Sequence, residues 1–253
     1  MGRRTKPPGV AEAFQPLGDL FGPGPGCLAG IGADGHRERM RARLLTAGPS
    51  ALADHEMLEM LLFLALPRRD TKPVARALLA RFGGFGPVIA ASPDVLRTVD
   101  GLGDAGIAAL KLAQAAALRL LKGELAGRRV LDTWDGLIAW LLAALRHEKT
   151  EILKVLFMDT RSRLLAEDDM GRGTIDHTPV YPREIARRAL ELHASMVILA
   201  HNHPAGTAAA SREDVAMTRE VSRALRTVGV DLFDHLIVAG DDCISMRQQN
   251  LLG

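Results

Sequence analysis

The sequence has few of the residues that stabilise secreted proteins or stack nucleobases. Its two cysteines, Cys27 and Cys243, lie far apart in unlike contexts, which excludes a disulfide framework and a cysteine-rich zinc site. Phe, Trp and Tyr make up only 4% of the chain, too little for an aromatic platform that stacks bases. No apolar run approaches the roughly 20 residues that span a bilayer, and no secretory signal is expected after the basic start. These absences predict a cytoplasmic protein with no membrane partner.

The remaining composition is that of an ordinary globular protein. The 253 residues can form one large domain or two small ones, with 47% hydrophobic and 25% charged residues. The net charge is +2, but the first 150 residues are net basic and the remainder is net acidic. A modestly basic front half permits contact with nucleic acid without requiring it.

The front of the chain is predicted to be a flexible leader followed by helices. Residues 1–34 contain the run Phe21-Gly-Pro-Gly-Pro-Gly26, which cannot form a regular element. Residues 35–122 are predicted to form a small all-α domain, and residues 125–131 a linker. The helices of this domain are expected at 37–45, 54–64, 74–81 and 107–121, with a turn cluster at 82–87 and a further helix start at Ser92-Pro93.

Residues 132–253 alternate between helical and strand patterns. Helices are expected at 134–146, 182–193 and 211–226, and strands at 151–158, 163–169, 196–200 and 232–239. This alternation predicts an α/β domain in which helices flank a mixed sheet.

The most informative stretch of this second part is His201-Asn202-His203, which is followed by Ser211 and Asp214. Residues two apart in an extended chain point the same way, so both imidazoles can face one point beyond the end of a strand. Ser211 is expected to open a helix that carries Asp214 in its first turn. Two imidazoles and one carboxylate leave a fourth position open on Zn²⁺, which is the pattern of a catalytic site.

A purely structural interpretation of the same residues competes with the metal site. Ser211-x-x-Asp214 is also what a helix N-terminus favours, because the hydroxyl caps it and the acid lies near the positive end of the helix dipole. His201 and His203 also fit ordinary polar residues at a strand end. The joint occurrence of both pieces at restrictive spacing favours the metal.

The spacing His-x-His, seven residues, Ser, two residues, Asp resembles the JAMM (MPN-type) metalloprotease motif. The strings 174–184 and 198–204 resemble the RadC family of bacterial proteins, and the resemblance runs from about Gly35 to the end of the chain. It implies a JAMM/MPN-like α/β fold with one Zn²⁺ held by His201, His203 and Asp214. The chain departs from the family pattern after Pro204, where Ala205 replaces a serine and residues 207–210 replace a proline-containing loop.

The resemblance also implies a catalytic glutamate on an earlier strand. Glu151, directly before the apolar run 152–158, matches this position best, and Glu148 and Glu184 are its rivals. The implied reaction is metal-assisted hydrolysis of a peptide or isopeptide bond, with Glu151 taking a proton from water and passing it to the leaving group. Ser211 is the candidate donor to the oxyanion.

Two further histidines receive lesser interpretations. His177, before a Pro-rich turn, is a candidate to reach the site from outside the ligand set. Asp234-His235 is interpreted as a structural hydrogen-bonded pair at the start of an apolar strand.

A second motif lies in the helical part. Leu96, Val99 and the turn Gly101-Leu102-Gly103, followed by the helical pattern of 107–121, resemble a helix-hairpin-helix element. Such a turn lets backbone N–H groups of these three residues approach a DNA phosphate without reading sequence. Two helices that simply join at a glycine turn explain the same pattern, and Asp104 directly after the turn would repel phosphate.

Functions of different classes therefore compete. The first is a zinc-dependent hydrolase of the JAMM type acting on a protein or peptide. The second is a DNA-binding or DNA-processing accessory protein of repair or recombination whose metal is not catalytic. A metal-dependent nuclease ranks third, because phosphodiester cleavage often uses paired metals.

Overall fold

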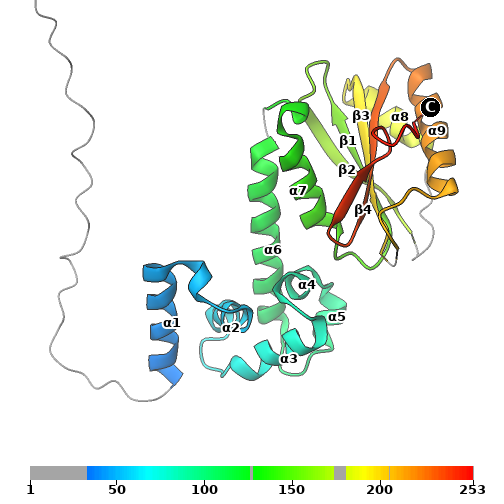
Figure 1. The fold of residues 1–253 in the computed structure, drawn as a ribbon. Coiled ribbons are helices and arrows are strands. Elements are labelled where there is room, and N and C mark those ends of the chain that lie inside the picture. Colours follow the sequence, from blue (N-terminus) through cyan, green and yellow to red (C-terminus); the bar gives the residue numbers. More distant parts are fainter. Residues whose placement is uncertain (1–32, 126–127, 174–180, 205, 253) are drawn as a thin grey trace, which may run out of the picture.

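The computed structural model describes residues 33–125, 128–173, 181–204 and 206–252 (Figure 1). The helical part consists of α1 (Ala33–Ala47), α2 (Asp54–Ala65), α3 (Lys72–Phe82), α4 (Phe85–Ala90), α5 (Pro93–Arg97) and α6 (Asp104–Leu125). Residues 1–32 of the predicted leader and residues 126–127 of the predicted linker lie outside the described residues, but α1 already begins at Ala33, one position before the predicted end of the leader.

The helices of this part enclose a core of their own. Their buried apolar side chains come from α2 through α6 and include Leu58, Leu62, Leu78, Leu96 and Leu110. Helices α2 and α6 approach closely because Gly106 has no side chain: a Cβ atom there would lie 2.6 Å from Leu102 Cδ1 and 3.3 Å from Leu62 Cδ2.

The predicted turn cluster at 82–87 is wrong in its second half. Gly83, with φ of 85°, ends α3, and the chain needs only Gly84 as well before α4 begins at Phe85. Pro87 is tolerated there because it lies in the first turn of α4, where its missing N–H costs no intrahelical bond.

The second part is built on a mixed sheet, which confirms the predicted α/β fold. Its strands are β1 (Ile152–Met158), β2 (Leu164–Arg172), β3 (Met196–Asn202), β4 (Asp231–Ala239) and β5 (Asp242–Ser245), in the order β2-β1-β3-β4-β5. Strands β3 and β4 are parallel, and the other neighbours are antiparallel. The sequence did not predict β5, whose four residues are too short for a recognisable alternation.

Helices cover both faces of this sheet (Figure 1). Leu153, Val155 and Phe157 of β1 pack against α8 (Pro182–Glu191) and α9 (Arg212–Thr227), whereas the alternate residues pack against α7 (Trp134–Leu145). Because both faces are buried, β1 and β3 are apolar runs without polar alternation.

Helix α6 connects the two parts. Its first half contributes Ile107 and Leu110 to the helical core, and its last turns place Leu118, Leu121 and Leu125 against the core of the sheet. The domain limits 35–122 and 132–253 therefore stay a prediction, since one helix serves both cores. Among the described residues, no helix is both long and apolar enough to cross a membrane.

Candidate metal centre

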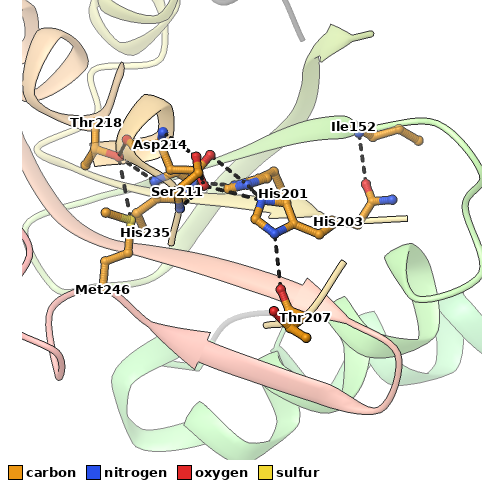
Figure 2. Close-up of polar contacts among 10 residues, drawn as sticks. Ile152, His201, His203, Thr207, Ser211, Asp214, Thr218, His235 and Met246 are labelled. Carbon is orange, nitrogen blue, oxygen red and sulfur yellow. Dashed lines mark hydrogen bonds and ion pairs between the residues drawn. The ribbon is translucent and has the colours of Figure 1, made fainter. Parts of the chain in front are cut away.

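Three predicted ligands meet where the carboxyl end of β3 faces the first turn of α9 (Figure 2). His201 Nε2 lies 3.1 Å from Asp214 Oδ1, and His203 Nε2 lies 3.3 Å from Asp214 Oδ2. The two Nε2 atoms lie 2.8 Å apart. His201 lies near the end of β3. The strand continues two residues beyond its predicted end at residue 200, because His201 and Asn202 pair with Ile237 and Val238 of β4.

These separations suit a single small cation. Ligands about 2.0–2.2 Å from a tetrahedral Zn²⁺ lie roughly 3.3 Å from one another. The two imidazole–carboxylate distances already have that length, and the two imidazoles need to separate by only about 0.5 Å. Among the described residues, His201, His203 and Asp214 form the one group of three or more His, Cys, Asp or Glu side chains whose possible ligand atoms all lie within 4.8 Å of one another.

The competing structural interpretation of Ser211 and Asp214 is also correct, since the two residues form a capping box at the start of α9. Ser211 Oγ accepts a hydrogen bond from Asp214 N at 3.0 Å, and Ser211 N donates to Asp214 Oδ2 at 2.7 Å. The Ser211 hydroxyl donates its hydrogen to the same Oδ2 at 2.6 Å. The cap therefore holds one carboxylate oxygen and leaves Oδ1 directed at His201.

This arrangement bears on the expected oxyanion role of Ser211. A serine hydroxyl has one hydrogen, and here Asp214 receives it. Donation to a substrate requires the hydroxyl to turn away from Oδ2, so the oxyanion role stays a prediction.

The electrostatics of the cluster favour a positive charge between the ligands. Burial by itself raises the pKa of the Asp214 carboxyl, but the neighbouring His201 and His203 rings outweigh it and hold that pKa far below its usual range. The hydrogen bond to Asp214 raises the pKa of His203 against the opposing effect of burial, and the Glu151 carboxylate adds to the rise. The carboxylates of Asp214 and Glu151 thus favour a positive charge at His203.

Glu151 lies directly before β1, near this site. In the antiparallel pair of β1 and β3, Leu153 lies opposite His201. Glu151 precedes Leu153 by two residues, and side chains two apart in an extended chain point to the same face. The charge of Glu151 acts on His203, in agreement with this placement.

The rival glutamates are engaged elsewhere. Glu184 lies on α8 and forms ion pairs with Arg183 and Arg187, which hold its pKa below the usual value. Glu148 lines a cleft with Lys111 on the α7 side of the sheet, the face away from the imidazoles. Both observations favour Glu151.

Sequence reasoning missed Asn202, which fixes the backbone around Glu151. Its buried side chain accepts a hydrogen bond from Ile152 N at 2.9 Å and donates to the carbonyl oxygens of Thr150, at 3.1 Å, and Glu148, at 3.3 Å. The signal was present in the sequence, because a residue between two ligands on a strand must point to the opposite face, where an amide needs partners.

Asp234 and His235 are hydrogen-bonded to each other, as the sequence predicts, but through the main chain of His235. Asp234 accepts from the backbone N of His235 and from Ser245 Oγ, whereas the His235 ring points to the other face of β4 and contacts His201. The two side chains separate because neighbours along a strand face opposite sides. His177 lies outside the described residues.

The predicted DNA-contact turn joins α5 and α6. Gly101 adopts a left-handed conformation with φ of 80°, Leu102 is buried in the helical core, and Gly103 is exposed. The exposed carboxylates of Asp94 and Asp104 flank this turn and share Arg97, which lowers its attraction for phosphate. Contact with DNA at 101–103 stays a prediction.

Comparison with known proteins agrees with the geometry. Residues 131–251 match the family model described as a RadC-like JAB domain. The chain is similar to a UPF0758 protein of Rhodobacter capsulatus, with 46% identity over 213 residues that cover 84% of this chain and 100% of the relative. It is also similar to a UPF0758 protein of Ruegeria pomeroyi, with 42% identity over 217 residues, 86% of this chain and 97% of the relative.

Proposed function

The chain belongs to the UPF0758 (RadC) family and carries a RadC-like JAB domain, and from this premise we propose that it is a zinc-dependent hydrolase of peptide or isopeptide bonds. The observation that carries the proposal is the convergence of His201, His203 and Asp214, with the charge of Glu151 acting on the second histidine. One such group among the described residues suits single-metal hydrolysis better than the paired-metal chemistry common in nucleases.

Each residue has a defined task in this proposal. His201 Nε2, His203 Nε2 and one oxygen of Asp214 would hold the ion, which would supply a water of much lowered pKa and a positive charge near the reacting carbonyl. Glu151 would take a proton from the attacking water and return it to the leaving amine. Ser211 turns its hydroxyl towards the oxygen of the attacked carbonyl.

The test is turnover by a Glu151→Gln variant on peptide and isopeptide libraries. The amide keeps the size of the side chain but cannot hold a proton, so turnover should fall by at least about 100-fold. The zinc content should stay at the wild-type level, because Glu151 is not a ligand.

Glu184→Gln is the matched control, since it makes the same chemical change on an exposed glutamate of α8 whose ion pairs are solvent-accessible. Its turnover should equal that of the wild type. Cleavage by Glu151→Gln at the wild-type rate would disprove the assignment of Glu151.

A further inference from the structure

A relay of buried, hydrogen-bonded polar groups leads from His201 into the core (Figure 2). His201 Nδ1 lies 2.7 Å from His235 Nε2 of β4. His235 Nδ1 lies 2.6 Å from Thr218 Oγ1 of α9, and this oxygen lies 2.5 Å from the main-chain oxygen of Asp214. The proposed hydrolysis assigns no task to Thr218 or His235, although both are completely buried.

The direction of the hydrogen bonds in this relay follows from its last member, the main-chain oxygen of Asp214. The carbonyl oxygen of Asp214 can only accept, so the single hydrogen of the Thr218 hydroxyl points to it. Thr218 Oγ1 must then accept from His235, which places a hydrogen on His235 Nδ1.

The other end of the relay gives the same pattern. His201 Nε2 lies beside Asp214 and His203, so ligation of an ion there uses the lone pair of Nε2 and leaves the ring hydrogen on Nδ1. His201 Nδ1 then donates to His235 Nε2, which accepts. His235 keeps its own hydrogen on Nδ1, in agreement with its hydrogen bond to Thr218.

We propose that Thr218 and His235 are positioning residues that fix the protonated nitrogen and the ring orientation of His201 for metal binding. The relay begins on the backbone of Asp214 and ends on the ring of His201, so it also sets the spacing between two ligands that come from different elements. This inference rests on the proposed function for the presence of an ion, but not on any cleavage reaction.

Removal of the Thr218 hydroxyl predicts a specific failure. Without an acceptor for Nδ1–H, His235 can carry its hydrogen on Nε2 and direct it at His201. His201 would then accept at Nδ1 and carry its own hydrogen on Nε2, at the position of the ion. Losing a hydrogen-bonded partner of a metal-binding histidine typically costs about 10–100-fold in metal affinity.

The experiment compares Thr218→Val with the matched control Thr218→Ser in the full chain. Valine has the shape of threonine without the hydroxyl, whereas serine keeps the hydroxyl and loses a methyl group. Zinc affinity is measured by competition with a chelator, and the hydrogen on each ring nitrogen is located by ¹⁵N NMR of the metal-free protein at pH 8.

We expect Thr218→Val to bind zinc about 10–100-fold more weakly and Thr218→Ser to remain within about threefold of the wild type. The wild-type spectrum should show both His201 and His235 protonated at Nδ1. Equal zinc affinity of Thr218→Val and the wild type would overturn the proposal, and so would a wild-type spectrum with His201 protonated at Nε2.

The wild-type spectrum decides the question even if the valine variant does not fold. If zinc affinity depends on Thr218 as expected but the protein cleaves no peptide, the proposed hydrolase is refuted and the positioning role stands. The two failures are thus distinguishable.

Discussion

Replacing Ser211 by alanine tests whether one hydroxyl both caps α9 and orients the carboxylate of Asp214. The change removes two hydrogen bonds, the one that Oγ accepts from Asp214 N and the one that it donates to Oδ2. The third bond of the capping box, from Ser211 N to Oδ2, remains. One of the three hydrogen bonds between Ser211 and Asp214 therefore survives.

The expected cost is that of losing a helix N-cap, about 1 kcal/mol. For a chain of this size, that loss corresponds to a fall of roughly 2–4 °C in melting temperature. Because Asp214 keeps its bond to the backbone, zinc affinity should fall by no more than about tenfold. If Ser211 also serves the oxyanion, turnover should fall by a further 100-fold or more, about 3 kcal/mol in the activation barrier.

Thermal unfolding of metal-free and zinc-loaded protein measures the first effect, and chelator competition measures the second. Ser211→Thr is the control, because threonine keeps the hydroxyl and caps helices nearly as well as serine. The reasoning fails if Ser211→Ala melts at the wild-type temperature, or if the threonine variant loses as much stability as the alanine variant.

Three further predictions concern other parts of the molecule. Gly101→Ala should destabilise the protein by about 1 kcal/mol because of its positive φ, whereas Gly103→Ala, with open space around its Cβ position, should leave the urea midpoint unchanged. Asn202→Leu leaves three main-chain groups around Glu151 without their partner, so unfolding experiments should show a loss of about 2 kcal/mol, and cleavage should slow. Burial, assisted by a nearby carboxylate, raises the pKa of Cys243 to about 11 and keeps it a protonated thiol at pH 8. In a chain whose other cysteine is replaced by serine, mass spectrometry should show alkylation about 100-fold slower than for a free thiol; alkylation at the free-thiol rate would contradict the burial.

The sequence predicts those features that depend on local periodicity. The pair His201 and His203 is visible because strand side chains alternate with a period of two, and Ser211-x-x-Asp214 is visible because a helix cap has fixed spacing. Both patterns are found in the structure, where the Asp214 carboxylate that completes the capping box also faces His201.

Features that depend on pairing between distant segments were not predictable from one sequence. His235 reaches His201 only because β4 lies parallel to β3 in a particular register, and Thr218 joins them only because α9 packs on the same face. The apolar pattern of β4 gives its burial but not its neighbour. The nearness of Glu151 to His203 likewise depends on the pairing of β1 with β3.

The zinc content of the purified protein tests the central claim most directly. After dialysis against zinc and then metal-free buffer, the wild type should retain one zinc ion per chain. Asp214→Ala, which removes the only carboxylate of the ligand group, should retain none at the same protein concentration. Equal zinc content in the two proteins, or a wild type that holds no zinc, would contradict a metal centre formed by His201, His203 and Asp214.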